Sequence, residues 1–159
     1  MKKKRKELTD EEKKKLNAWI EPCLLPEVHH LGEQVRGVAR YDKREQMYGG
    51  NGTVYLMQLF CEGELVNNRI AAYMILPEKG VSAGFHTHGT RSEQELYVVM
   101  SGEGEYHEKS SVNGEIRSVP VQKGSVTSVR GDAYHAVTNR GEEPMIIFVI
   151  TTNEPVRES

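Results

Sequence analysis

Residues 80–104, GVSAGFHTHGTRSEQELYVVMSGEG, decide the fold class of this chain. Within them, His86 and His88 stand two residues apart in a strand-like run, so both imidazoles project to one face of the strand. Glu95 begins the next strand-like run, and the six residues between His88 and Glu95 can make the turn that joins two antiparallel strands. Two histidines and a carboxylate on neighbouring strands form half of a metal site with nitrogen and oxygen ligands.

Outward from this stretch, short runs rich in β-branched and aromatic residues alternate with turns that carry glycine. The pairs Asn51-Gly52 and Asn113-Gly114 predict two-residue hairpin turns, in which both central residues need a positive φ. Strands at this close spacing, with no helices between them, predict an all-β antiparallel sandwich or barrel. The predicted strands are residues 53–60, 69–76, 85–88, 95–100, 104–108, 116–121, 125–129, 135–139 and 145–151.

A fourth candidate ligand, His135, begins a later strand directly after a turn at residues 130–133. The other three histidines lack comparable partners in the pattern, and we expect them to be ordinary polar residues. They are His29, His30 and His107.

These spacings resemble the first motif of the cupin superfamily, which is a glycine, five residues, His-x-His, three or four residues, a glutamate, six residues and a glycine. Gly80 stands five residues before His86-Thr-His88, and Glu95 stands six residues before Gly102. The interval from His88 to Glu95 is six residues, which is longer than the family pattern.

The longer interval leaves two glutamates open as the ligand. Glu93 satisfies the short interval but leaves eight residues before Gly102. Glu95 is preferred, because residues 95–104 look like the family's strand and turn, and Glu93 has the same strand parity.

The second cupin motif is a glycine, five residues, Pro-x-Gly, two residues, a histidine, three residues and an asparagine. Gly124, His135 and Asn139 stand at the expected places. Arg130 replaces the proline and Asp132 replaces the glycine, which weakens the match of the turn but not of the ligand.

The resemblance covers about residues 53–152 and implies a cupin barrel, a double-stranded β-helix or jelly roll. It also implies one divalent transition metal ion per chain, held by His86, His88, Glu95 and His135. With no thiolate in this set, iron, manganese, nickel and zinc all fit the donors.

Cupins that resemble this chain include dioxygenases, isomerases, epimerases and lyases. We therefore expect a small metalloenzyme that acts on a small polar metabolite, such as a sugar or an organic acid. Glu93 and Tyr97, which share the strand parity of Glu95, are the candidate acid–base groups. A non-catalytic cupin that binds or senses a small ligand through its metal stays open as the alternative, because this barrel hosts many functions. A storage-type cupin is disfavoured by the intact ligand set.

The N-terminal part differs from the rest in pattern, and predicts a covering segment at residues 1–50 before a barrel at residues 51–159. Thr9 and Glu12 form a capping box that predicts one short helix, which Pro22 ends. Its apolar stripe is Leu16, Trp19 and Ile20. Residues 22–50 carry two prolines and several glycines, and are expected to be irregular with one short helical turn.

Some predicted strands are apolar on both faces. Leu96, Val98 and Met100 lie opposite Glu95, and residues 145–150 are apolar throughout. A half-solvated antiparallel strand alternates with polar residues, so both faces of these strands must be covered, by residues 1–50 or by another subunit. We therefore expect a homodimer or a larger assembly.

Composition and charge narrow the classes of protein to which this chain can belong. The 159 residues are 37% hydrophobic and 28% charged, which is typical of one globular domain. Five basic residues at positions 2–6 leave the rest of the chain at a net charge of about −7, which argues against a nucleic-acid-binding face. No apolar run is long enough for a membrane span or an export signal, and two cysteines are too few for a disulfide framework. A cytoplasmic protein with reduced thiols is expected.

Overall fold

The computed structural model describes residues 6–22, 37–61, 64, 71–89, 93–129 and 132–153. His29, His30, Cys23 and the turn residues Arg130 and Gly131 lie outside the described residues. Among the described residues, no helix is both long and apolar enough to cross a membrane.

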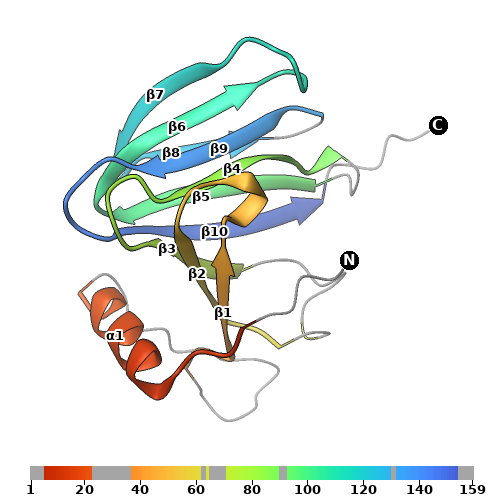
Figure 1. Cartoon of the computed structure of the whole chain (residues 1–159). Coiled ribbons are helices and arrows are strands. Elements are labelled where there is room, and N and C mark those ends of the chain that lie inside the picture. The colour runs from red at the N-terminus through yellow and green to blue at the C-terminus, as the bar shows by residue number, and fades with distance from the viewer. Residues whose placement is uncertain are drawn as a thin grey trace.

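The chain folds into two antiparallel sheets that face one another (Figure 1). The six-stranded sheet has the order β1-β2-β3-β10-β5-β8, and the four-stranded sheet has the order β4-β9-β6-β7. The predicted all-β architecture is confirmed, and the nine predicted strands correspond to β2–β10. The strands are β1 Arg40–Glu45, β2 Thr53–Gln58, β3 Ala71–Leu76, β4 Ser82–Thr87, β5 Glu93–Ser101, β6 Glu103–Lys109, β7 Arg117–Gln122, β8 Val126–Val129, β9 Tyr134–Asn139 and β10 Met145–Asn153.

The predicted N-terminal helix is α1, Asp10–Ile20, and its capping box is confirmed. The Glu12 backbone N–H donates to Thr9 Oγ1 at 3.1 Å, and the Thr9 N–H donates to Glu12 Oε2 at 2.9 Å. The Lys43 ammonium on β1 lies 2.6 Å from Glu12 Oε1, which ties the start of the helix to the edge of the sheet.

Two apolar clusters explain why some strands are hydrophobic on both faces. Met74 on β3 and Ile147 on β10 point between the sheets, into the inner cluster. Tyr73 and Ile75 on β3 point the other way, into an outer cluster that α1 covers with its buried apolar residues. We call these the inner cluster and the outer cluster. The outer cluster consists of Leu8, Leu16, Ile20, Met57, Tyr73, Ile75 and Ile146. The inner cluster consists of Met47, Val54, Leu56, Met74, Leu76, Val81, Ala83, Tyr97, Val99, Tyr106, Val121, Val137, Met145, Ile147 and Val149.

The expectation of irregular structure with one short helical turn covers residues 22–50, of which 23–36 lie outside the described residues. The short turn is present as η1 (Met47–Gly49), but the expectation is wrong for β1. This strand pairs along its whole length with β2, from Arg40 opposite Gln58 to Glu45 opposite Thr53. Its sequence is polar because its buried residue is Asp42, whose carboxylate lies 3.2 Å from Arg40 Nε and 3.8 Å from Arg44 Nη2. A strand stabilised by an ion triad has no hydrophobic alternation for sequence reasoning to detect.

The two predicted hairpin turns are also wrong in type. Seven residues, including the 3₁₀ turn η1 (Met47–Gly49), join β1 to β2, and of the pair Asn51-Gly52 only Gly52 has a positive φ, +72°. Neither Asn113 nor Gly114 has a positive φ, and the Gly114 N–H donates to the Ser111 carbonyl at 3.0 Å. Both loops are longer than two residues. The type I′ and II′ turns, which need positive φ at central residues, are required only in two-residue hairpin loops.

Candidate metal centre

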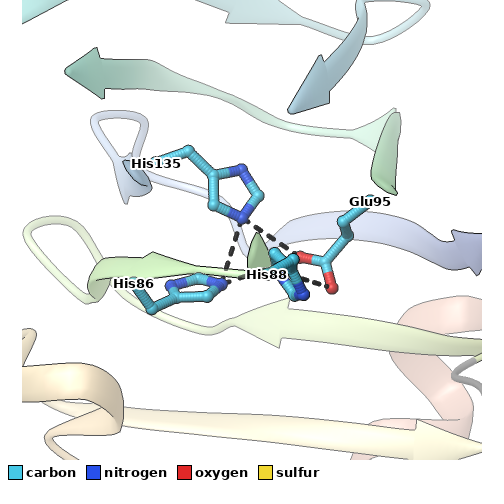
Figure 2. A group of neighbouring side chains, drawn as sticks. All are labelled: His86, His88, Glu95 and His135. Carbon is cyan, nitrogen blue, oxygen red and sulfur yellow. Dashed lines mark hydrogen bonds and ion pairs between the residues drawn. The ribbon is translucent and has the colours of Figure 1, made fainter. Parts of the chain in front are cut away.

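Three strands bring four buried side chains together between the sheets (Figure 2). His86 lies on β4 and His88 directly follows that strand, Glu95 lies on β5, and His135 lies on β9. His86 and His135 are cross-strand partners, which sets their rings against each other, and β5 supplies the carboxylate from the opposite sheet. These are the four residues that the two sequence motifs single out.

The donor atoms of the four side chains all lie within 4.8 Å of one another. His135 Nε2 is 3.0 Å from His86 Nε2 and 3.3 Å from Glu95 Oε1. His88 Nε2 is 3.3 Å from Glu95 Oε2. Donors about 2.1 Å from an octahedral ion lie about 3.0 Å from their neighbours, so these separations are those of a ligand shell.

The outer nitrogen of each ring has a hydrogen-bond acceptor that fixes its tautomer. His86 Nδ1 donates to the Gly84 carbonyl at 2.8 Å, and His88 Nδ1 donates to Glu93 Oε2 at 3.3 Å. His135 Nδ1 donates to the Tyr106 hydroxyl at 3.3 Å. Since each Nδ1 carries the hydrogen, all three Nε2 atoms present lone pairs to the centre of the group.

The arrangement of these donors is unfavourable unless a cation lies among them. It therefore tests whether the four residues suit a metal ion. Two imidazole lone pairs face each other at 3.0 Å, between His86 and His135. His88 Nε2 is buried and makes no hydrogen bond with any described residue. Buried nitrogen atoms without partners are costly, and a divalent ion among the four donors satisfies them all.

The electrostatics of the group are dominated by Glu95. Burial opposes ionisation of its carboxyl, but the contacts with His135, His86 and His88 outweigh burial and hold the pKa of Glu95 well below its usual range. Burial lowers the pKa of His135 to about 4, so this ring is neutral at neutral pH. Burial also opposes protonation of His88, yet the Glu95 and Glu93 carboxylates prevail and raise the pKa of His88. Protonation of His88 therefore competes with metal binding at this site.

The two candidate glutamates occupy different places. Glu95 contributes its oxygens to the group of donors, whereas Glu93 accepts from the far side of the His88 ring. A carboxylate behind a metal-binding histidine fixes the orientation of that ring and increases its basicity. The geometry therefore favours Glu95 as ligand and Glu93 as a positioning residue.

Tyr97, the other acid–base candidate, lies beside the group. Its ring stacks on His135 with centroids 4.9 Å apart. Burial, followed by the negative charge of Glu95, raises the pKa of Tyr97 well above its ordinary value. Its hydroxyl therefore stays protonated and can donate a hydrogen bond but not act as a base.

Sequence reasoning missed three residues around the group. The Tyr106 hydroxyl, which accepts from His135, donates to Glu108 Oε2 at 3.2 Å. Strand parity could have found this pair, since both stand an even number of residues from Gly104 on β6. The third residue is Tyr48, whose ring stacks on His86; it lies in the segment expected to be irregular, and no sequence pattern marks it.

His107, expected to be an ordinary polar residue, lies away from the four donors. Its ring nitrogens contact the hydroxyls of Ser118, at 2.7 Å, and Thr138, at 3.3 Å. This histidine is therefore a natural control for substitutions in the donor group.

Comparison with known proteins agrees with the fold and the motifs. A family model described as a cupin domain matches residues 72–151. The oxalate-binding protein of Thermotoga maritima is 33% identical over 110 residues, which cover 69% of this chain and 84% of that protein.

Solved structures show the same architecture. A crystal structure described as a predicted oxalate decarboxylase from Thermotoga maritima superposes with a TM-score of 0.62 at 27% identity, and the match covers 72% of this chain and 92% of that one. The cupin domain of Schizosaccharomyces pombe Cnp3 superposes with a TM-score of 0.52 at 14% identity, over 64% of this chain and 61% of that one, which is a likeness of fold alone.

Proposed function

Because this chain belongs to the cupin family, we propose that it binds a small organic dicarboxylate of the oxalate class at a protein-bound divalent metal ion. His86, His88, Glu95 and His135 hold the ion. The single observation that carries the proposal is the convergence of three imidazole lone pairs and one carboxylate within 4.8 Å in a buried site.

The charge and coordination of such a site suit a small anion. A divalent ion supplies positive charge and open coordination positions to a bound ligand. Four protein donors leave two positions of a six-coordinate ion open, and one carboxylate among the donors leaves one positive charge uncompensated in the ligand shell. The names of the relatives favour an organic acid over a sugar as the ligand.

The residues beside the donors favour binding over proton transfer. Glu93 is engaged with His88 Nδ1, and the Tyr97 hydroxyl stays protonated. Tyr97 and the metal-binding rings therefore orient and surround a ligand, and neither acid–base candidate is poised to take a proton from it. Binding without turnover is accordingly the first candidate.

Turnover of the same ligand is the second candidate, and it is favoured by the open metal positions and by the likeness to a predicted oxalate decarboxylase. Loss of carbon dioxide from hydrogen oxalate would leave formate. Formate release from oxalate by the metal-loaded protein, assayed in air and without oxygen, distinguishes turnover from binding.

The test of the proposed function is calorimetric titration of oxalate into manganese-loaded protein and into the same protein after chelation and dialysis. We expect one oxalate to bind per metal-loaded chain and none to bind to the metal-free chain. Equal binding with and without metal, or no binding to the loaded protein, would contradict the proposal.

A further inference from the structure

An aromatic ring from the turn between β1 and β2 covers one side of the donor group. The Tyr48 ring lies 3.9 Å from the His86 ring, centroid to centroid, at an interplanar angle of 17°. This is a stacked pair of aromatic rings, an arrangement that stabilises the contact beyond the burial of its surface. Tyr48 belongs to η1, which lies beside β4 (Figure 1).

The backbone of this turn is held in a conformation that non-glycine residues rarely adopt. Tyr48 has φ 53° and ψ 34°, and Gln46 has φ 48° and ψ 49°. Left-handed conformations at such residues are strained and persist where the surroundings impose them. A bulky aromatic residue rarely adopts left-handed backbone dihedral angles, so its contacts must explain the conformation.

Here the surroundings do impose the conformation. A Cβ atom at Gly84 would lie 2.3 Å from the Tyr48 carbonyl oxygen, and one at Gly50 would lie 2.2 Å from the Ser82 carbonyl oxygen. Two glycines thus let the turn lie directly against β4. The Asn51 N–H also donates to Ser82 Oγ at 2.8 Å, and the Met47 side chain is buried in the inner cluster.

The exposure of the side chains shows that this turn stands at the accessible side of the centre. His88, Glu95 and His135 are 2%, 4% and 1% exposed, whereas His86 is 9% exposed and is the donor that solvent reaches most easily. Tyr48, stacked on that same ring, is 41% exposed. One edge of the tyrosine thus contacts solvent while its face covers the most accessible ligand.

We propose that Tyr48 is a specificity-determining residue at the mouth of the metal centre: its ring shields His86 and restricts the open metal positions to small dicarboxylates. This inference rests on the proposed function for the identity of the ligand, but the shielding of His86 stands on the stacking geometry alone. The strained turn between β1 and β2 serves to hold the ring in place.

The test uses three variants and two measurements. Tyr48→Ala removes the ring, Tyr48→Phe keeps it, and Gln46→Gly relieves the neighbouring strained residue while leaving the ring in place. The first measurement is the rate at which diethyl pyrocarbonate modifies His86 in metal-free protein, followed by peptide mass spectrometry. The second is the preference of manganese-loaded protein for oxalate over the longer succinate, measured by calorimetry.

We expect Tyr48→Ala to modify about three to ten times faster at His86 and to lose preference for oxalate by a similar factor, while Tyr48→Phe and Gln46→Gly match the wild type. An unchanged labelling rate in Tyr48→Ala would overturn the shielding, and faster labelling with unchanged preference would overturn the specificity role. If loaded wild-type protein binds no oxalate, the proposed function and the specificity role fail together, and the labelling rates still decide whether Tyr48 covers His86.

Discussion

The two sides of the six-stranded sheet differ in what they bury. On the outer side, Tyr73 and Ile75 pack with α1 in the outer cluster, where the buried side chains are apolar. On the inner side, the same sheet faces the apolar inner cluster and also supplies Glu95 to a buried polar group, whose three histidines lie on or beside strands of the opposite sheet. Burial of apolar side chains on the outer side stabilises the fold, whereas burial of polar groups on the inner side lowers its stability.

This division predicts that stability and metal binding can be changed separately. Ile75→Ala removes buried apolar volume from the outer cluster, so we expect the free energy of unfolding of metal-free protein to fall by about 2–5 kcal/mol. The affinity for manganese should stay that of the wild type. Urea unfolding and metal titration measure the two quantities, with the exposed Val112→Ala as the control for stability. Loss of metal affinity in Ile75→Ala would show that the two sides are not independent.

The helix α1 covers only part of the outer side of the six-stranded sheet. On β5 and β8, Leu96 and Val98 are half-buried and Val126 is 61% exposed. We expect this face to be the interface of a homodimer, because burying each valine contributes about 1.5–3 kcal/mol. Val98→Lys should therefore weaken dimerisation by about tenfold or more, as measured by sedimentation equilibrium. A wild-type mass near 18.0 kDa at all micromolar concentrations would contradict the dimer.

On the inner side, the Glu93 carboxylate is expected to raise manganese affinity by orienting His88. Glu93→Gln removes the charge behind His88 while preserving its shape, and the expected loss of manganese affinity is about 10- to 100-fold. Glu105→Gln, which changes a carboxylate beside His107 instead, is the matched control and should have no effect.

The pH profile of the same variant gives a second result. A proton on His88 excludes the metal, so affinity falls as the pH drops through the His88 pKa, which its neighbouring carboxylates raise. In Glu93→Gln that pKa is lower, and the loss of affinity should begin at a lower pH. A profile that does not move would mean that Glu93 has no influence on His88.

The sequence predicted the donor group well because strand periodicity decides which side chains share a face. His86 and His88 are two apart near one strand, and Glu95 and Tyr97 are two apart on the next, so each pair shares a face. The expectation that a turn joins these two strands as antiparallel neighbours is wrong, because β4 and β5 lie in opposite sheets and the side chains meet across the space between the sheets. The same periodicity placed Glu93 near the site, but it could not decide whether Glu93 binds the metal or orients a histidine that does. That distinction depends on which nitrogen of His88 each carboxylate faces.

Residues 40–50 could not be predicted for two physical reasons. β1 is stabilised by the buried Asp42 and its arginine partners, so it lacks the apolar alternation that marks a strand. The conformation of Tyr48 is imposed by Gly84, which is distant in sequence, and local pattern carries no trace of such a contact.

Metal analysis of protein purified without added metal measures whether the four inner side chains bind one metal ion. His135→Ala removes a donor, and His107→Ala removes a histidine of the same sheet that lies outside the group. We predict about one divalent ion per chain in the wild type and in His107→Ala, and a loss of affinity of more than about 100-fold in His135→Ala. A wild type that binds no divalent ion even when one is supplied, or metal content unchanged in His135→Ala, would show that these side chains do not form a metal site.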